Sequence, residues 1–196
     1  MRSRGHLAFG AASLGLVFLA LSCASAIRVY VNPEADLAFY KRIAVLPFAD
    51  LSSMSLAGPR VTRAFITELI MTNRFQVVEP EEFTGALRRK GVRPEQDGSY
   101  DPGKLKDAAA EMGVAGILRG AVTEYQVSRN DGGDVPVIAF DAELMDVNTG
   151  NVVWRSSISK RGRGRIAVVG GGKRSLGRLT QDACVELVAR LKGKGI

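Results

Sequence analysis

Histidine is nearly absent from this 196-residue chain: its one copy, His6, lies within a short basic stretch at the N-terminus. Serine–histidine and cysteine–histidine catalysis both need an imidazole, and most zinc sites use one as a ligand. If the N-terminal stretch is removed during maturation, the mature chain holds no histidine. The sequence therefore predicts no metal site, no cofactor and no catalytic residue that depends on histidine.

Cysteine is almost as scarce, since the chain has only Cys23 and Cys184. Cys184 has Leu187 and Val188 as neighbours at helical spacing, so we predict a small core residue there. Cys23 follows an apolar stretch near the N-terminus. If Cys23 is chemically modified, no disulfide within the chain can form, and the domain must be stable through packing alone.

An apolar run long enough for a membrane-spanning helix is also missing. Residues 7–22 are sixteen residues without a charge, whereas a spanning helix needs roughly 20. The stretch before them has two arginines and no acid, and small residues follow. This order is typical of a secretory signal. An uncleaved N-terminal membrane anchor is the alternative interpretation.

Two cleavage sites fit this signal. Ala24-Ser25-Ala26 matches the rule for ordinary signal peptidase, which would release a chain that starts at Ile27. Ala20-Leu21-Ser22-Cys23 instead resembles the lipobox of bacterial lipoproteins, whose cysteine thiolate takes up a diacylglyceryl group. We favour lipidation of Cys23. The predicted segments are then a signal peptide over 1–22, a lipidated tether over 23–40 and one domain over 41–196.

Acidic residues are rare in the last part of the chain. From Cys23 to Trp154 there are 14 Lys and Arg against 18 Asp and Glu, whereas residues 155–196 hold 11 against 2. An exported protein seldom meets nucleic acid, so we expect anionic lipid headgroups, glycans or an acidic protein surface as the partner. A solvated basic loop would explain the same composition. The residues predicted to make the contact are Arg161, Arg163, Arg165, Lys173 and Arg174.

Hydrophobic periodicity predicts an α/β fold: a mixed sheet of about five strands with helices packed on it. Residues 43–46 are a short continuous apolar run, as in a strand that is buried on both faces. Apolar residues at helical spacing predict four helices, and the second half is richer in strands. The helices are predicted after Gly58, from Glu81, over 103–112 and over 176–191, and the other strands over 74–79, 116–128, 135–147 and 151–159.

The segment 135–147 alternates between apolar residues on one face and a second face that includes Asp141 and Glu143. Two carboxylates on one strand resemble the pair that glycosidases use, which makes an envelope glycosidase the alternative function. The exposed face of an amphipathic strand predicts the same residues, however. We therefore prefer a protein without catalytic activity.

Four segments carry a resemblance to a known family: RIAVLPFADLSS, ELIMTNRFQVVE, AAAEMGVAGILRGAVTEYQ and LMDVNTGNVVWRSS. Together they resemble the periplasmic domain of the CsgG-like lipoproteins, the family of the curli secretion channel. The wider group includes lipoproteins of exopolysaccharide export, the lipoprotein activators of peptidoglycan synthases and the N-terminal domain of TolB.

This resemblance implies a lipoprotein anchored in the outer membrane, facing the periplasm and without catalytic activity. Members bind other envelope proteins and often form homo-oligomeric rings. The implied function is a binding or assembly component of cell-envelope export or biogenesis, with regulation of peptidoglycan synthesis as the runner-up. Ala24 after the cysteine favours the outer membrane. A pore is not expected, because the loops are too short or too basic to supply the roughly 9–11 lipid-facing residues of each spanning strand.

Overall fold

One mixed sheet with helices on both faces makes up the described part of the computed structural model, which covers residues 26–93, 100–130, 133–162 and 175–191. No helix in these ranges is long and apolar enough to cross a membrane. The strands are β1 (Ala26–Val31), β2 (Arg42–Val45), β3 (Ala49–Asp50), β4 (Gln76–Val78), β5 (Gly116–Asn130), β6 (Gly133–Asp146) and β7 (Val152–Arg161). The helices are α1 (Ala57–Met71), α2 (Pro80–Arg89), α3 (Pro102–Glu111) and α4 (Leu176–Arg190), with a short 3-10 helix, η1 (Leu37–Phe39).

The strands follow the order β1-β7-β6-β5-β2-β4. β3 lies off this path and pairs with β5 further along that strand than β2 does. β1, β7, β6 and β5 are antiparallel neighbours, whereas β2 lies parallel to both β4 and β5. This confirms the predicted α/β fold with a mixed sheet. The sheet has seven strands rather than about five, because β1 and the two-residue β3 were not expected from the sequence.

β1 occupies part of the segment that the sequence predicts to be a tether. It pairs along its whole length with β7, from Ala26 opposite Ser159 to Val31 opposite Trp154. The Asn32 backbone N–H continues this contact by donating to the Val153 carbonyl at 2.9 Å. Without β1, the backbone groups along this edge of β7 would have no partner in the sheet. The folded domain therefore begins at least as early as Ala26.

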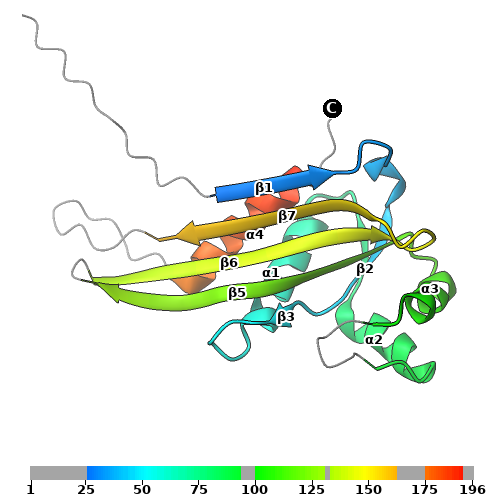
Figure 1. The fold of residues 1–196 in the computed structure, drawn as a ribbon, viewed down its shortest axis with the longest axis horizontal. Coiled ribbons are helices and arrows are strands. Elements are labelled where there is room, and N and C mark those ends of the chain that lie inside the picture. Colours follow the sequence, from blue (N-terminus) through cyan, green and yellow to red (C-terminus); the bar gives the residue numbers. More distant parts are fainter. Residues whose placement is uncertain (1–25, 94–99, 131–132, 163–174, 192–196) are drawn as a thin grey trace, which may run out of the picture.

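Two pairs of helices cover different parts of the sheet. In Figure 1, α1 and α4 lie behind the long strands, and their apolar sides form the larger core with the buried face of β5, β6 and β7. α2 and α3 pack on the opposite face, only at the end where β5 begins. Alternate residues of the chain from Ile43 to Leu46 enter the two cores, as predicted for a strand buried on both faces.

The alternation predicted for β6 is confirmed. Ile138, Phe140, Ala142 and Leu144 are all at most 2 % exposed, and they lie in the core beneath α1 and α4. Cys184 of α4 is fully buried in the same core, and this burial raises the pKa of its thiol. It is therefore the core residue that its helical neighbours indicated.

A hydrogen-bonded carboxylate joins the chain before β2 to the turn after β6. The Tyr40 hydroxyl donates to Asp146 Oδ2 at 2.9 Å, and Asp146 Oδ1 accepts from the backbone N–H groups of Asn148 and Thr149. Burial alone would raise the pKa of Asp146, but hydrogen bonds from Thr149 and Tyr40 bring this pKa below its usual value. Burial, together with the Asp146 charge, raises the pKa of Tyr40 to about 12.

We predict that Tyr40→Phe lowers the free energy of unfolding at neutral pH by about 1.5–3 kcal/mol, because it removes a hydrogen bond to a charged group. The pKa of Tyr40 is higher in the folded state, so its contribution is complete below pH about 10 and is lost as pH rises towards 12. Denaturant unfolding at several alkaline pH values should therefore show a steeper loss of stability in the wild type than in Tyr40→Phe. Equal slopes would contradict the assignment.

Candidate functional site

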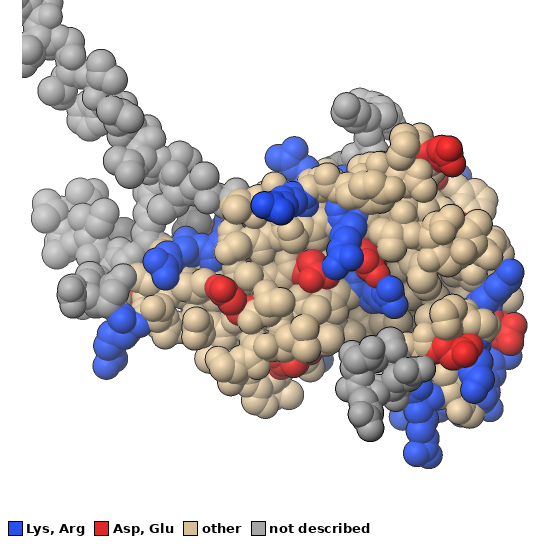
Figure 2. Space-filling model, viewed as in Figure 1, with Lys and Arg blue, Asp and Glu red and all other residues tan. Residues whose placement is uncertain are grey.

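Part of the sheet carries no helix on one side within the described residues. This area belongs to β5, β6, β7 and β1, on the side opposite α1 and α4 and beyond α2 and α3, and we call it the open sheet face. Figure 2 views it directly and shows basic and acidic side chains close together near its centre. Strand register places there Arg119 on β5, Asp141 and Glu143 on β6, Arg155 on β7, and Arg28 and Tyr30 on β1.

Glu143 is the centre of an ion-pair network on this face. Arg119 Nε donates to Glu143 Oε1 at 2.6 Å, and Arg155 Nη1 lies 3.4 Å from Glu143 Oε2. Arg155 also lies 3.8 Å from Asp141 Oδ1. Glu143 is only 7 % exposed, so the two guanidinium groups cover it from the neighbouring strands. A buried carboxylate is tolerated because both of its oxygens have a cationic partner.

The network follows one straight row across four strands. Arg119, Glu143 and Arg155 are direct cross-strand partners, and Tyr30 is the partner of Arg155 on β1. The next row holds Asp141 and Arg28, with small side chains at Ala121 and Ser157. Cross-strand neighbours lie about 4.5–5.5 Å apart at their Cβ atoms, which is close enough for the long side chains to touch. The result is a charged row with an exposed tyrosine at its end, beside a second row that adds one aspartate and one arginine.

The two carboxylates considered for glycosidase chemistry lie on this face, as predicted, but their surroundings favour recognition over catalysis. Burial is the main cause of the raised pKa of Asp141, and Arg155 partly offsets it. Glu143 is held by two cations. The pocket described below lies on the other side of the sheet, away from both carboxylates.

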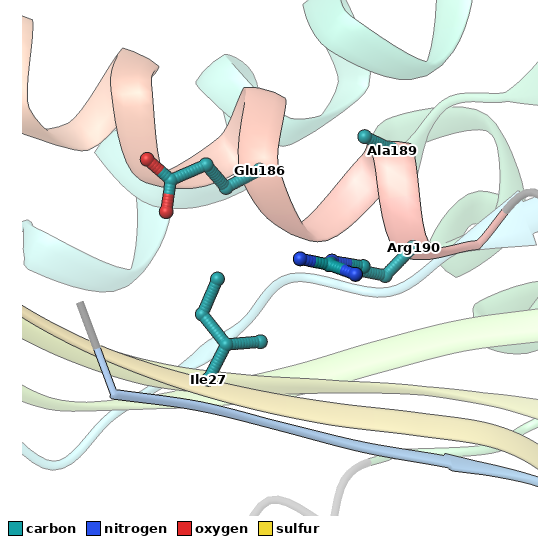
Figure 3. A pocket seen from close by; sticks show the side chains of 4 residues that line it. All are labelled: Ile27, Glu186, Ala189 and Arg190. Atoms are coloured by element: carbon teal, nitrogen blue, oxygen red, sulfur yellow. The ribbon is translucent and has the colours of Figure 1, made fainter. Parts of the chain in front are cut away.

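That pocket lies between β1 and α4. Ile27, Glu186, Ala189 and Arg190 line it, and Figure 3 shows Ile27 pointing from β1 towards the helix. Glu186 is paired with Lys160 of β7. Val29 and Val31, which are on the same side of β1 as Ile27, are 43 % and 38 % exposed. α4 thus leaves the apolar side of the edge strand partly uncovered.

Most of the other predicted site residues lie outside the described ranges. These are Cys23, Arg163, Arg165, Lys173 and Arg174, whose roles stay predictions. Arg161 is described: it is exposed and is the last residue of β7. Sequence reasoning missed Arg119, Arg155 and Tyr30. The signal was present in part, because Arg119 and Arg155 are charged residues in segments predicted to be strands, whereas Tyr30 lies in the segment predicted to be a tether.

Proteins with the same fold are known among solved structures. The PelC dodecamer from Paraburkholderia phytofirmans is 19% identical over 88% of this chain and 100% of that chain, with a TM-score of 0.62. Lipoprotein GNA1162 from Neisseria meningitidis is also 19% identical, over 76% of this chain and 98% of that chain, with a TM-score of 0.53. No curated protein sequence matches the chain. At this identity the likeness establishes the fold class alone.

The sequence itself gives the family. The model of the family described as peptidoglycan-synthase activator LpoB matches residues 40–158, more than half of the chain. The chain therefore belongs to the LpoB family, non-catalytic lipoproteins of the cell envelope that activate peptidoglycan synthesis. This is one of the groups to which the sequence segments pointed, whereas the narrower CsgG-like assignment is not shown.

We predict a coupling free energy of about 1–2 kcal/mol between Arg119 and Glu143 in a double-mutant cycle with Arg119→Ala and Glu143→Ala. This lies between the values of exposed and fully buried pairs, because the Arg119 side chain is 39% exposed and solvent screens the pair. The measurement is denaturant unfolding of the four proteins. The Arg129–Asp134 pair, whose side chains are 86% and 38% exposed, serves as the control and should couple by less than about 0.5 kcal/mol. Equal coupling in the two pairs would contradict the central role of Glu143.

Proposed function

We propose that this protein activates a peptidoglycan synthase by binding it through the open sheet face. The observation that carries the proposal is the row Arg119–Glu143–Arg155–Tyr30. The Arg155 side chain is 57% exposed and Tyr30 is 52% exposed, although both are on paired strands. Arginine and tyrosine dominate the energetics of many protein interfaces, and strands hold them with little loss of entropy on binding.

The proposed contact depends on complementary shape and charge, and this protein catalyses no reaction in it. Glu143 pairs with the Arg155 guanidinium, and because the Arg155 side chain is 57% exposed it can also meet a carboxylate of a partner. The partner surface that fits would offer acidic groups to Arg155 and an apolar patch to Tyr30. The glycosidase alternative requires that Glu143 be free to act on a sugar, whereas here it is engaged by two arginines.

The proposed location is the outer membrane, with the domain in the periplasm. Residues 1–22 are removed as a signal peptide, Cys23 carries the lipid, and Ala24 favours the outer membrane. Membership of a lipoprotein family supports the anchor. The basic residues Arg161, Arg163, Arg165, Lys173 and Arg174 are proposed to contact an anionic partner.

The protein is also proposed to associate with copies of itself. β1 is an edge strand of the sheet, and the exposed Val29 and Val31 lie along it. Unpaired edges with apolar side chains readily pair with another chain. The PelC structure with the same fold is a dodecamer, which shows that this fold is compatible with such an assembly.

We predict that Tyr30→Ala combined with Arg155→Ala raises the concentration needed for half-maximal activation of the synthase by at least tenfold, as loss of interface hot spots does. The measurement is glycan polymerisation by the synthase of the same organism, with the lipoprotein titrated. Arg88→Ala on α2 is the control, because Arg88 is exposed and lies outside the open sheet face. Unchanged activation by the double variant, with its fold intact by circular dichroism, would refute the proposal.

We predict that the protein purified from membranes starts at Cys23 and carries acyl chains on that residue. Intact mass spectrometry of the protein and of its N-terminal peptide tests this, and native mass spectrometry of the same sample gives the size of the assembly. An unmodified terminus at Ile27 would rule out the anchor. A lone monomer at all concentrations would rule out self-association and leave the synthase contact to be judged by the activation assay.

A further inference from the structure

The folded domain begins very close to the residue proposed to carry the lipid. Ala26, the first residue of β1, follows Cys23 by three residues and is already paired with Ser159 of β7. A chain spans at most about 3.3–3.6 Å per residue, so the Cα atoms of Cys23 and Ala26 are at most about 11 Å apart. The sequence predicted a tether up to residue 40. Because β1 is paired in the sheet, only the residues between Cys23 and Ala26 are left to serve as a tether.

Strand pairing shows which end of the domain lies next to the start of β1. Ala26 pairs with Ser159, and two residues later β7 ends at Arg161, which is opposite Val137 near the start of β6. We call this the anchor end. α4 begins here too: Thr180, in its second turn, hydrogen-bonds to Tyr125 of β5. α2 and α3 lie at the other end of the sheet, on the right of Figure 1.

The anchor end offers exposed basic side chains. Arg28 and Arg161 are exposed on β1 and β7, on the same side of the sheet. Arg129 and Lys160 are also here, but they are paired with Asp134 and Glu186. The sequence 161–175 holds five basic residues and no acid, and it joins the end of β7 to the start of α4. Both ends of this basic sequence are therefore attached at the anchor end.

We propose that the anchor end is a membrane-contact surface that binds anionic phospholipid headgroups through Arg28 and Arg161. This inference rests on the lipidation of Cys23 proposed above. Short covalent attachment brings this end to the bilayer, and positive charge then favours one orientation of the domain on an anionic surface. The two effects act at the same corner of the fold, because β1 starts where β7 ends.

This orientation limits how far the open sheet face can lie from the bilayer surface. Tyr30 lies four residues along β1 from Ala26, or about 13 Å at the rise of a β-strand. Tyr30, at one end of the charged row, is therefore within about 25 Å of Cys23. A synthase that contacts this row must bring its own binding surface close to the membrane that holds the lipid.

The test uses the full lipidated protein in vesicles that carry an energy acceptor on some lipid headgroups. A donor dye is placed at the anchor end with Ser159→Cys or at the far end with Lys104→Cys; both positions are exposed, and Cys184 is buried and does not compete for the dye. The expected result is stronger energy transfer from position 159 than from position 104. Equal transfer from the two positions would overturn the proposal.

A flexible Gly-Ser insertion between Ser25 and Ala26 separates the effect of the tether from that of charge. With the insertion, strong transfer from position 159 should persist in vesicles of phosphatidylcholine with phosphatidylglycerol and fall in phosphatidylcholine alone. Adding Arg28→Glu and Arg161→Glu should shift the orientation equilibrium by at least roughly 25-fold, at about fivefold for each basic charge lost. Arg88→Glu with Arg93→Glu, near α2, makes the same charge change and should leave the transfer unchanged.

The outcomes separate the two proposals. If the insertion abolishes preferential transfer in both vesicle types, headgroup binding by the anchor end is refuted although the lipid anchor stands. If the protein does not remain with the vesicles and its N-terminus has the mass of an unmodified chain, the lipid anchor itself is refuted, and the orientation falls with it.

Discussion

The antiparallel ladder of β5, β6, β7 and β1 is the constraint on which the rest of the structure depends. Side chains alternate strictly along a strand, so one register fixes both the core beneath α1 and α4 and the charged row on the opposite face. A slip of one residue in β6 would carry Glu143 into the core and Leu144 onto the open sheet face. The cost of burying an unpaired carboxylate opposes that slip, in addition to the loss of apolar burial. Core and site are thus specified by the same pairing.

Much of the fold could be predicted because local patterns were strong. The alternation of 135–147 and the helical spacing in 176–191 each identify an element and its buried side, and both are confirmed. β1 was missed for a physical reason. Its residues are mostly exposed, and its stability comes from pairing with β7, which is more than a hundred residues away in sequence. The two-residue β3 is likewise defined only by its pairing with β5.

The site was predicted only in part, for the same reason. Glu143 and Asp141 were found as neighbours on one face, because alternation along a single strand is a local property. The sequence suggested that this face was exposed, whereas Glu143 is buried. Its burial depends on Arg119 and Arg155, which reach it from two different strands. No pattern within one segment could supply that register, so a carboxylate pair that resembled catalytic residues is part of an ion-pair network.

A short anchor and a stiff sheet together would restrict both the orientation of the domain and its distance from the membrane. A long flexible tether would let the domain take any orientation and reach far from its membrane. Here the strand begins three residues after Cys23, so the lipid proposed there would act on the end of a rigid element. The rows across the strands would then lie at increasing height above the bilayer: Ala26 and Ser159 first, then Arg28, then the row that ends at Tyr30. In that arrangement, a partner would be recognised by the chemistry of the charged row and also by the distance between that row and the bilayer.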